Sequence, residues 1–243
     1  MKFNSFQIKL FMMFLMVFDH LSIIPGLLSI EAVSVLHFIT RPVATWFAFT
    51  LVEGFMHTHN RWNYCKRLFL FATIMMIGNG IIMVTINPDL FPTFPNIIFA
   101  LALCSLMLNL FFDKQTIDKI PPILRIGLGT LVTITCALFA EGSFIIPLLV
   151  LIFYHQYNKP KARNAWLWGL TLFLAIPALI MTITMNGSIF TFLYNEGWYI
   201  LVIPFINMYN GKPGKKSKFT QYLFYVFYPL HIWVIYIIAA LVK

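Results

Sequence analysis

Four ionisable side chains lie within the first two long apolar stretches of this chain. Asp19 and His20 are neighbours in the first stretch, and Arg41 and Glu53 lie in the second. Such groups are costly at the depth of a lipid bilayer unless they are paired, and those that occur usually mark a functional site. These four residues therefore predict a site between two neighbouring membrane helices.

Asp19 and Arg41 are expected to pair with each other. Successive residues of a helix point about 100° apart, so Asp19 does not face His20 and is a poor candidate for orienting it. A pair between Asp19 and Arg41 would neutralise two otherwise isolated charges. The pair could belong to the chemistry of the site, or it could only link two helices.

His20 is the candidate general base, because imidazole titrates near neutral pH and can take a proton from a nucleophile. The alternative is a core histidine bonded to a backbone carbonyl. With a rise of about 1.5 Å per residue, His20 lies about 16 Å beyond Lys9 and Arg41 about 15 Å from Glu31. Both are then near the middle of a hydrocarbon core of about 30 Å. His231, in the last apolar stretch, reaches the middle or the outer half.

A second polar group follows at the end of the second apolar stretch. Glu53 and His57 are four residues apart and share one helix face, and Arg61, Lys66 and Arg67 come next. Arginine and histidine side chains suit phosphate groups, so this cluster is a candidate docking surface for a phosphorylated cosubstrate such as coenzyme A. The alternative is that these cations only extend towards the membrane interface.

The composition requires a lipid environment. Of 243 residues, 60% are hydrophobic and 10% are charged, whereas a soluble domain has about 25% charged residues. We expect one integral-membrane domain over residues 1–243, an all-α bundle of about nine transmembrane segments. They lie near 7–29, 33–56, 67–86, 96–112, 122–140, 142–157, 164–185, 194–208 and 219–242. Whether 142–157 and 194–208 cross fully is left open, because both are short and contain proline.

The net charge of +9 reports orientation rather than a nucleic-acid partner. If the N-terminus is cytoplasmic and the segments alternate, every basic residue except Arg41 and Lys243 falls on the cytoplasmic side. Acidic residues occupy the opposite loops: Glu31, Asp89, Glu141 and Glu196. Such asymmetry predicts an N-inside, C-outside protein of the cytoplasmic membrane.

The cysteines do not indicate a disulfide framework or a metal site. Cys65, Cys104 and Cys136 are odd in number and widely spaced, without the spacing typical of metal ligands. We expect them to be packing residues, and we expect no metal.

Several short motifs are typical of a known family. They are Asp19-His20, Arg41–Asn60 (RPVATWFAFTLVEGFMHTHN), Tyr64–Leu68, Phe153-Tyr154, Tyr209–Lys212 and Phe227–His231. Together they span most of the chain in order, and they resemble the TraX family of membrane proteins. That family is associated with N-terminal acetylation of the pilin subunit of conjugative plasmids. It also looks similar to a wider group of transmembrane acyltransferases.

This resemblance implies an acetyltransferase that uses cytoplasmic acetyl-CoA. The acetyl group would pass to an acceptor amine or hydroxyl on a peptide, lipid or glycan, at or across the membrane. The implied catalytic residues are His20, Asp19 and Arg41. Acetyl-CoA would dock against Glu53, His57, Arg61, Lys66 and Arg67, and the acceptor side would include Tyr228, His231 and Glu141. Direct transfer and a transient acetyl-imidazole on His20 are both open.

Two other classes compete with the enzyme. A small transporter or flippase could use intramembrane charges as a permeation path, although no internal repeat of the kind common in transporters is visible. Pro147 and Pro204 keep this class open. A non-enzymatic adaptor would use the charges only to fix helix packing. A homo-oligomer is also open, because no packing motif in the chain favours one.

Overall fold

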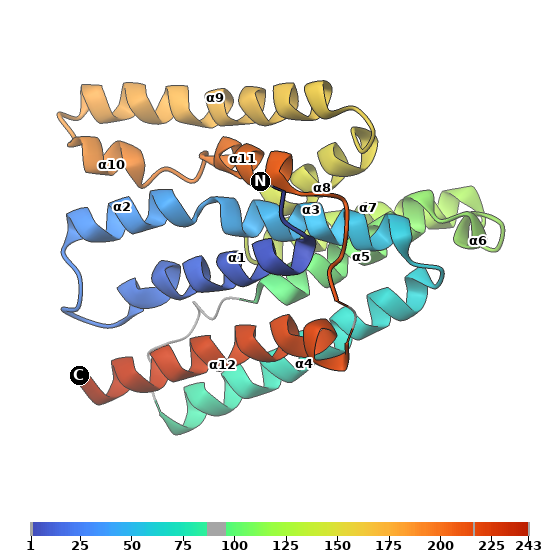
Figure 1. Cartoon of the computed structure of the whole chain (residues 1–243), viewed down its shortest axis with the longest axis horizontal. Helices are drawn as coiled ribbons and strands as arrows, with labels where there is room; N and C mark the ends of the chain where they lie inside the picture. The colour runs from blue at the N-terminus through green and yellow to red at the C-terminus, as the bar shows by residue number, and fades with distance from the viewer. Residues whose placement is uncertain (1, 87–95, 216, 243) are drawn as a thin grey trace. The chain divides into compact units, whose positions relative to one another are not determined.

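The computed structural model describes residues 2–86, 96–215 and 217–242 (Figure 1). Within these ranges the regular elements are helices, with one isolated β-bridge between Phe3 and Tyr209. The all-helical prediction is therefore confirmed for the described part of the chain. Asp89, Lys216 and Lys243, which entered the charge argument, lie outside it.

Six helical runs are long and apolar enough to cross a membrane. They are Ser5–Ile23, Ile30–His57, Arg61–Thr85, Pro122–Phe139, Pro160–Thr184 and Phe219–Val242. Three further apolar helices are shorter: Ile97–Phe112, Ile145–His155 and Tyr199–Met208. The chain is thus a multi-pass membrane protein. The count of nine spans is not confirmed, because a crossing helix needs about 20 residues, and the orientation stays a prediction.

The chain forms two compact units, which are described separately. The first contains residues 1–46 and 158–243, and the second contains residues 47–157. Helix α3 (Pro42–His57) begins in the first unit and ends in the second.

The first unit holds the two ends of the chain. Its elements are α1 (Ser5–His20), η1 (Leu21–Ile23), α2 (Ile30–Thr40), α9 (Pro160–Thr184), α10 (Ile189–Leu193), η3 (Tyr199–Val202), α11 (Ile203–Met208) and α12 (Lys218–Val242). Helix α1 packs against α2 and α12, while α10 packs against α2 and α9 (Figure 1). A capping box of Asn4 and Gln7 begins α1, because each side chain satisfies a backbone N–H of the other residue.

The second unit is built around α5. Its elements besides α3 are α4 (Arg61–Thr85), α5 (Ile97–Phe112), α6 (Lys114–Ile117), α7 (Pro122–Phe139) and α8 (Ile145–His155). Helix α5 packs against α4, α7 and α8, and most of its residues are buried. A helix that is apolar on every side belongs in a core of this kind. The three cysteines are buried and unbonded, with the sulfur atoms of Cys104 and Cys136 3.9 Å apart.

Candidate functional site

A break in the helical backbone positions the side chain of Arg41. Pro42 has no N–H to donate to the carbonyl of Phe38, and the Arg41 N–H donates to that carbonyl instead, at 3.4 Å. The carbonyl of His37 therefore loses its usual helical donor. Arg41 Nε and the Thr40 hydroxyl both donate to it, each at 3.0 Å. The Thr-Arg-Pro sequence thus anchors the base of the guanidinium group.

The two ends of the Arg41 guanidinium bind two carboxylates. Nη2 lies 2.9 Å from Asp19 Oδ1, and Nη1 binds Glu196 Oε2. The single hydroxyl hydrogen of Thr40 is shared between the His37 carbonyl and Asp19 Oδ1, while His37 Nε2 lies 3.2 Å from Glu196 Oε1. We call Asp19, His37, Arg41 and Glu196 the Arg41 network. The predicted pairing of Asp19 with Arg41 is confirmed.

Glu196 and His37 were not among the predicted site residues. Glu196 lies in the turn between α10 and η3, 155 residues from its partner Arg41. Its side chain is 65% exposed, against 15% for Arg41, so it closes the network on the outside. The ring of His37 stacks on Tyr194 at 4.3 Å between centroids. The available signal was that Glu196 is the one acidic residue in the apolar stretch 194–208.

His20 ends α1 as a buried residue and meets His231 of α12. Its Nδ1 is 2.8 Å from the carbonyl of Met16 and 3.4 Å from Nε2 of His231. His231 Nδ1 in turn lies 3.0 Å from the carbonyl of Phe227. A carbonyl can only accept, so both Nδ1 atoms carry hydrogen, and in the neutral form of each ring Nε2 then carries a lone pair. The carbonyl contact expected of a core histidine is present, yet it leaves Nε2 of His20 able to accept a proton.

Two of the three predicted acceptor-side residues join His20. The Tyr228 ring is buried against that of His231, with centroids 5.4 Å apart, and His231 meets His20 directly. Glu141 belongs to the second unit, in the turn between α7 and α8. The structure therefore groups Tyr228 and His231 with the catalytic candidate, while Glu141 belongs to the other unit.

The predicted cosubstrate cluster lies in the second unit and includes an unpredicted tyrosine. His57 Nδ1 is 2.9 Å from the carbonyl of Glu53 and 3.8 Å from its carboxylate. The Tyr157 hydroxyl lies 3.5 Å from the same nitrogen. Burial, together with the nearby charge of Glu53, raises the pKa of Tyr157 to about 12. Tyr157 therefore stays protonated at neutral pH and can donate a hydrogen bond.

Arg61 is largely committed to contacts within its own unit. Its Nη1 binds Asp113 at 2.9 Å, and its Nε donates to the carbonyl of Phe55 at 3.2 Å. The guanidinium also lies 4.4 Å from the centre of the Phe55 ring. Asp113 additionally caps α6 through Thr116. This arginine joins the start of α4 to the turn after α5.

Lys66 and Arg67 lie further along α4 and are less committed. Lys66 is exposed, and the guanidinium of Arg67 lies 5.5 Å from the centre of the Tyr64 ring. Nε of Arg67 is buried and has no hydrogen-bond partner among the described residues. These two cations are therefore better placed than Arg61 to bind an anionic ligand.

These features define a multi-pass helical membrane protein with a partly buried ionic network and a histidine pair. The family model described as TraX protein matches residues 5–239, so the chain belongs to the TraX family. The resemblance expected from short motifs is thereby confirmed over nearly the whole chain. Neither the curated proteins nor the solved structures compared with the chain gave a match.

Proposed function

We propose that this protein is a membrane-embedded acetyltransferase, which moves an acetyl group from cytoplasmic acetyl-CoA to an acceptor amine or hydroxyl. Membership of the TraX family supports this class. The observation that carries the proposal is the hydrogen bonding of His20, whose Nδ1 contacts the Met16 carbonyl and His231, so that Nε2 of the neutral ring can accept a proton. The acceptor is a peptide, lipid or glycan.

In the proposed reaction, His20 transfers one proton from the acceptor to coenzyme A. As the acceptor nitrogen or oxygen attacks the thioester carbon, Nε2 takes the acceptor proton and the carbon–sulfur bond breaks. The proton then passes from His20 to the coenzyme A thiolate, which leaves as the thiol. In the covalent variant, Nε2 itself attacks the thioester carbon, the carbon–sulfur bond breaks and the coenzyme A thiolate leaves. The acceptor then attacks the acetyl-imidazole, which regenerates His20, and the acceptor proton passes to the thiolate.

The neighbours of His20 can interact with the charge that forms on its ring in this scheme. An imidazolium has a stronger Nδ1–H donor, which Met16 and His231 accept. Asp19 adds a negative charge beside the ring. Arg41 is a positioning residue here, because three of its nitrogens already hold Asp19, Glu196 and the His37 carbonyl. Its remaining N–H groups could stabilise the developing oxyanion.

The phosphates of acetyl-CoA are assigned to the second unit. Lys66 is exposed, and the buried Nε of Arg67 has no hydrogen-bond partner in the described part of the chain, so we assign both to an anionic ligand. His57 is exposed as well, and Glu53 and Tyr157 hold its ring. Arg61 contributes by fixing the α4–α5 contact rather than as a free cation.

The test is label transfer from radioactive acetyl-CoA in membranes that contain the native acceptors. We expect label in a protein, lipid or glycan fraction with wild type, and a loss to background with His20→Ala. His155→Ala is the matched control, because His155 is exposed and is not assigned to either cluster. Label that is unchanged in His20→Ala would contradict the proposal. Gradient-dependent uptake into vesicles would then indicate a transporter, and tolerance of alanine at Asp19 and Arg41 an adaptor.

A further inference from the structure

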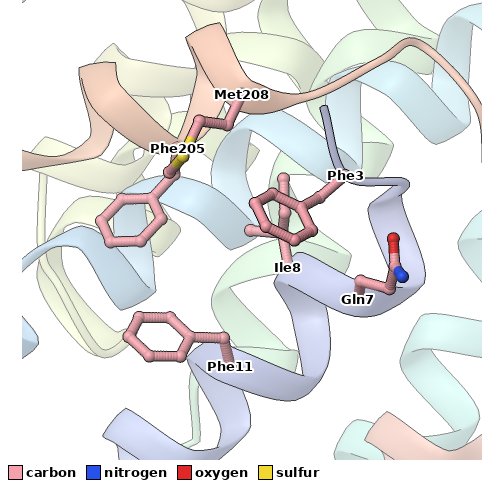
Figure 2. A pocket seen from close by; sticks show the side chains of 6 residues that line it. All are labelled: Phe3, Gln7, Ile8, Phe11, Phe205 and Met208. Carbon is pink, nitrogen blue, oxygen red and sulfur yellow. The ribbon is translucent and has the colours of Figure 1, made fainter. Parts of the chain in front are cut away.

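An apolar pocket lies between the start of α1 and α11 (Figure 2). Its volume is about 390 Å³, within the range of about 300–1,000 Å³ that is usual for small-molecule sites. The lining residues are Phe3, Gln7, Ile8, Phe11, Phe205 and Met208. Gln7 is the polar member of this set, and the rings of Phe11 and Phe205 stack at 5.6 Å. The lining predicts an apolar occupant.

Backbone hydrogen bonds hold the two sides of this pocket together. The N–H of Phe3 donates to the carbonyl of Met208 at 2.8 Å, and the N–H of Asn210 donates to the carbonyl of Phe3 at 2.9 Å. Ser5 donates to the carbonyl of Lys212 at 2.9 Å. A chain terminus tied down in this way does not fray like a free one. The pocket is therefore a built feature of the first unit.

The pocket is continuous with a lipid-facing surface. Phe11 lines it and is 45% exposed, and Phe14 on the same helix is 59% exposed. Helix α1 belongs to a run long and apolar enough to span the bilayer, where exposed rings contact lipid chains. A hydrocarbon chain can therefore enter this pocket sideways from the membrane.

Positive charge surrounds the same end of α1. The two segments that form and flank the pocket, 2–11 and 205–215, contain lysines and no acidic residue. Lys2, Lys212 and Lys215 are exposed. The pairing of Ser5 with Lys212 brings the lysines of both segments to one end of the helix. Basic groups at a membrane surface attract anionic headgroups.

We propose that this pocket binds one acyl chain of an anionic phospholipid, with the lipid phosphate against Lys2, Lys212 and Lys215. The apolar lining favours the acyl chain, and the lysines favour a negatively charged headgroup. In the predicted orientation the lipid comes from the cytoplasmic leaflet. The site stands apart from the His20 chemistry and does not depend on the proposed acetyl transfer.

Photolabelling tests where the acyl chain of the lipid binds. The full-length protein is placed in nanodiscs with phosphatidylglycerol that carries a diazirine in its acyl chain, and labelled peptides are mapped. We expect adducts concentrated in residues 3–11 and 205–208. Met208→Trp fills the pocket and should reduce those adducts severalfold. Phe14→Trp, on the exposed side of the same helix, should leave them unchanged. Even labelling of all exposed apolar helices, insensitive to Met208→Trp, would overturn the proposal.

The headgroup is tested with a matched charge series. Phosphatidylglycerol should label the pocket better than phosphatidylcholine with the same chains. Each lysine replaced in Lys2→Gln, Lys212→Gln and Lys215→Gln should lower that preference by up to about fivefold. The control replaces three other exposed lysines by glutamine: Lys119, Lys159 and Lys161. Equal labelling by both lipids, displacement by free inorganic phosphate, or cross-links between two copies of the chain at this pocket would each contradict the assignment.

Discussion

At the residue scale, His231 is expected to act through His20. Its Nε2 lone pair faces the Nδ1–H of His20 at 3.4 Å, so it steadies that ring and the charge that forms on it. We expect His231→Ala to lower kcat for acetyl transfer about tenfold, a modest share of the 10²–10⁴ typical of acid–base groups. The KM for acetyl-CoA should not change, because His231 is not among the residues proposed to bind acetyl-CoA.

His231→Gln provides the control for this prediction. Its amide oxygen can accept the same Nδ1–H, so it should retain most of the wild-type kcat. Steady-state rates with acetyl-CoA and the acceptor found by label transfer measure both variants. Equal kcat in wild type, the alanine variant and the glutamine variant would show that the histidine pair has no part in transfer.

The Arg41 network makes a prediction about stability. Arg41→Gln leaves the carboxylate of Asp19 without its main partner, since the two lie 2.9 Å apart and are only 15% and 25% exposed. The loss should be about 3 kcal/mol in the free energy of unfolding, near the low end for buried pairs. Asp19→Asn removes that stranded charge, so the double variant should be more stable than Arg41→Gln alone.

Unfolding in mixed detergent micelles measures this cycle. Glu196→Gln is the comparison, because Glu196 is 65% exposed and exposed pairs contribute about 1 kcal/mol or less. If the effects of Asp19→Asn and Arg41→Gln simply added, the two residues would not be energetically coupled.

Much of this site could be predicted from the sequence, and the remainder depends on contacts between distant segments. Asp19, His20 and Arg41 can be identified from the sequence because ionisable side chains are unusual within an apolar stretch. His37 and Glu196 do not stand out in the same way, since each reads as an interfacial residue near a segment end. Only the fold brings Glu196 to Arg41 across 155 residues of sequence.

At the element scale, a proline decides what Arg41 can do. The apolar pattern of 33–56 predicts one helix, whereas the structure ends α2 at Thr40 and starts α3 at Pro42. The hydrophobic pattern cannot reveal this break, because the residues before and after it belong to the same apolar stretch. The missing N–H of Pro42 is the local signal for it. The break leaves the His37 carbonyl for Arg41 Nε to bind.

The short helices show a second limit of pattern reading. Residues 96–112 and 142–157 predict membrane segments, and helices do form there as α5 and α8. Their apolar composition is as strong as that of the longer helices, so composition cannot separate a full span from a core helix. Helix α5 is mostly buried by α4, α7 and α8. Length and packing, rather than hydropathy, distinguish these elements.

At the scale of the whole molecule, contacts between helix ends constrain the path of the chain. In the second unit, Arg61 at the start of α4 pairs with Asp113 just after α5. Arg125 near the start of α7 donates to the Phe111 carbonyl, and the Tyr157 hydroxyl, just after α8, meets His57. Helix α5 therefore returns the chain to the end at which α4 begins, and α8 returns it to the C-terminal end of α3.

In the first unit, residues 189–208 return the chain along α1. Helix α10 packs on α2, which follows the first crossing of the chain. Tyr209, just after α11, pairs instead with Phe3, which precedes that crossing. Residues 189–208 therefore lead from the C-terminal end of α1 back to its N-terminal end. They form an interrupted helix, and Glu196 lies in the interruption. Irregular backbone of this kind is tolerated at membrane depth where protein surrounds it.

This path predicts that the C-terminus lies on the opposite side of the membrane from the N-terminus. The prediction takes the three shorter apolar helices as crossings too, so that each crossing before Tyr209 has a return and α12 then crosses alone. The lysine-rich ends predict that the N-terminus is cytoplasmic. Fusions expressed in a bacterial inner membrane test this: green fluorescent protein after Lys212 should fluoresce, and alkaline phosphatase at the C-terminus should be active. If only the six long runs crossed, both termini would lie on one side, and a C-terminal phosphatase without activity beside a fluorescent C-terminal fusion would establish that alternative.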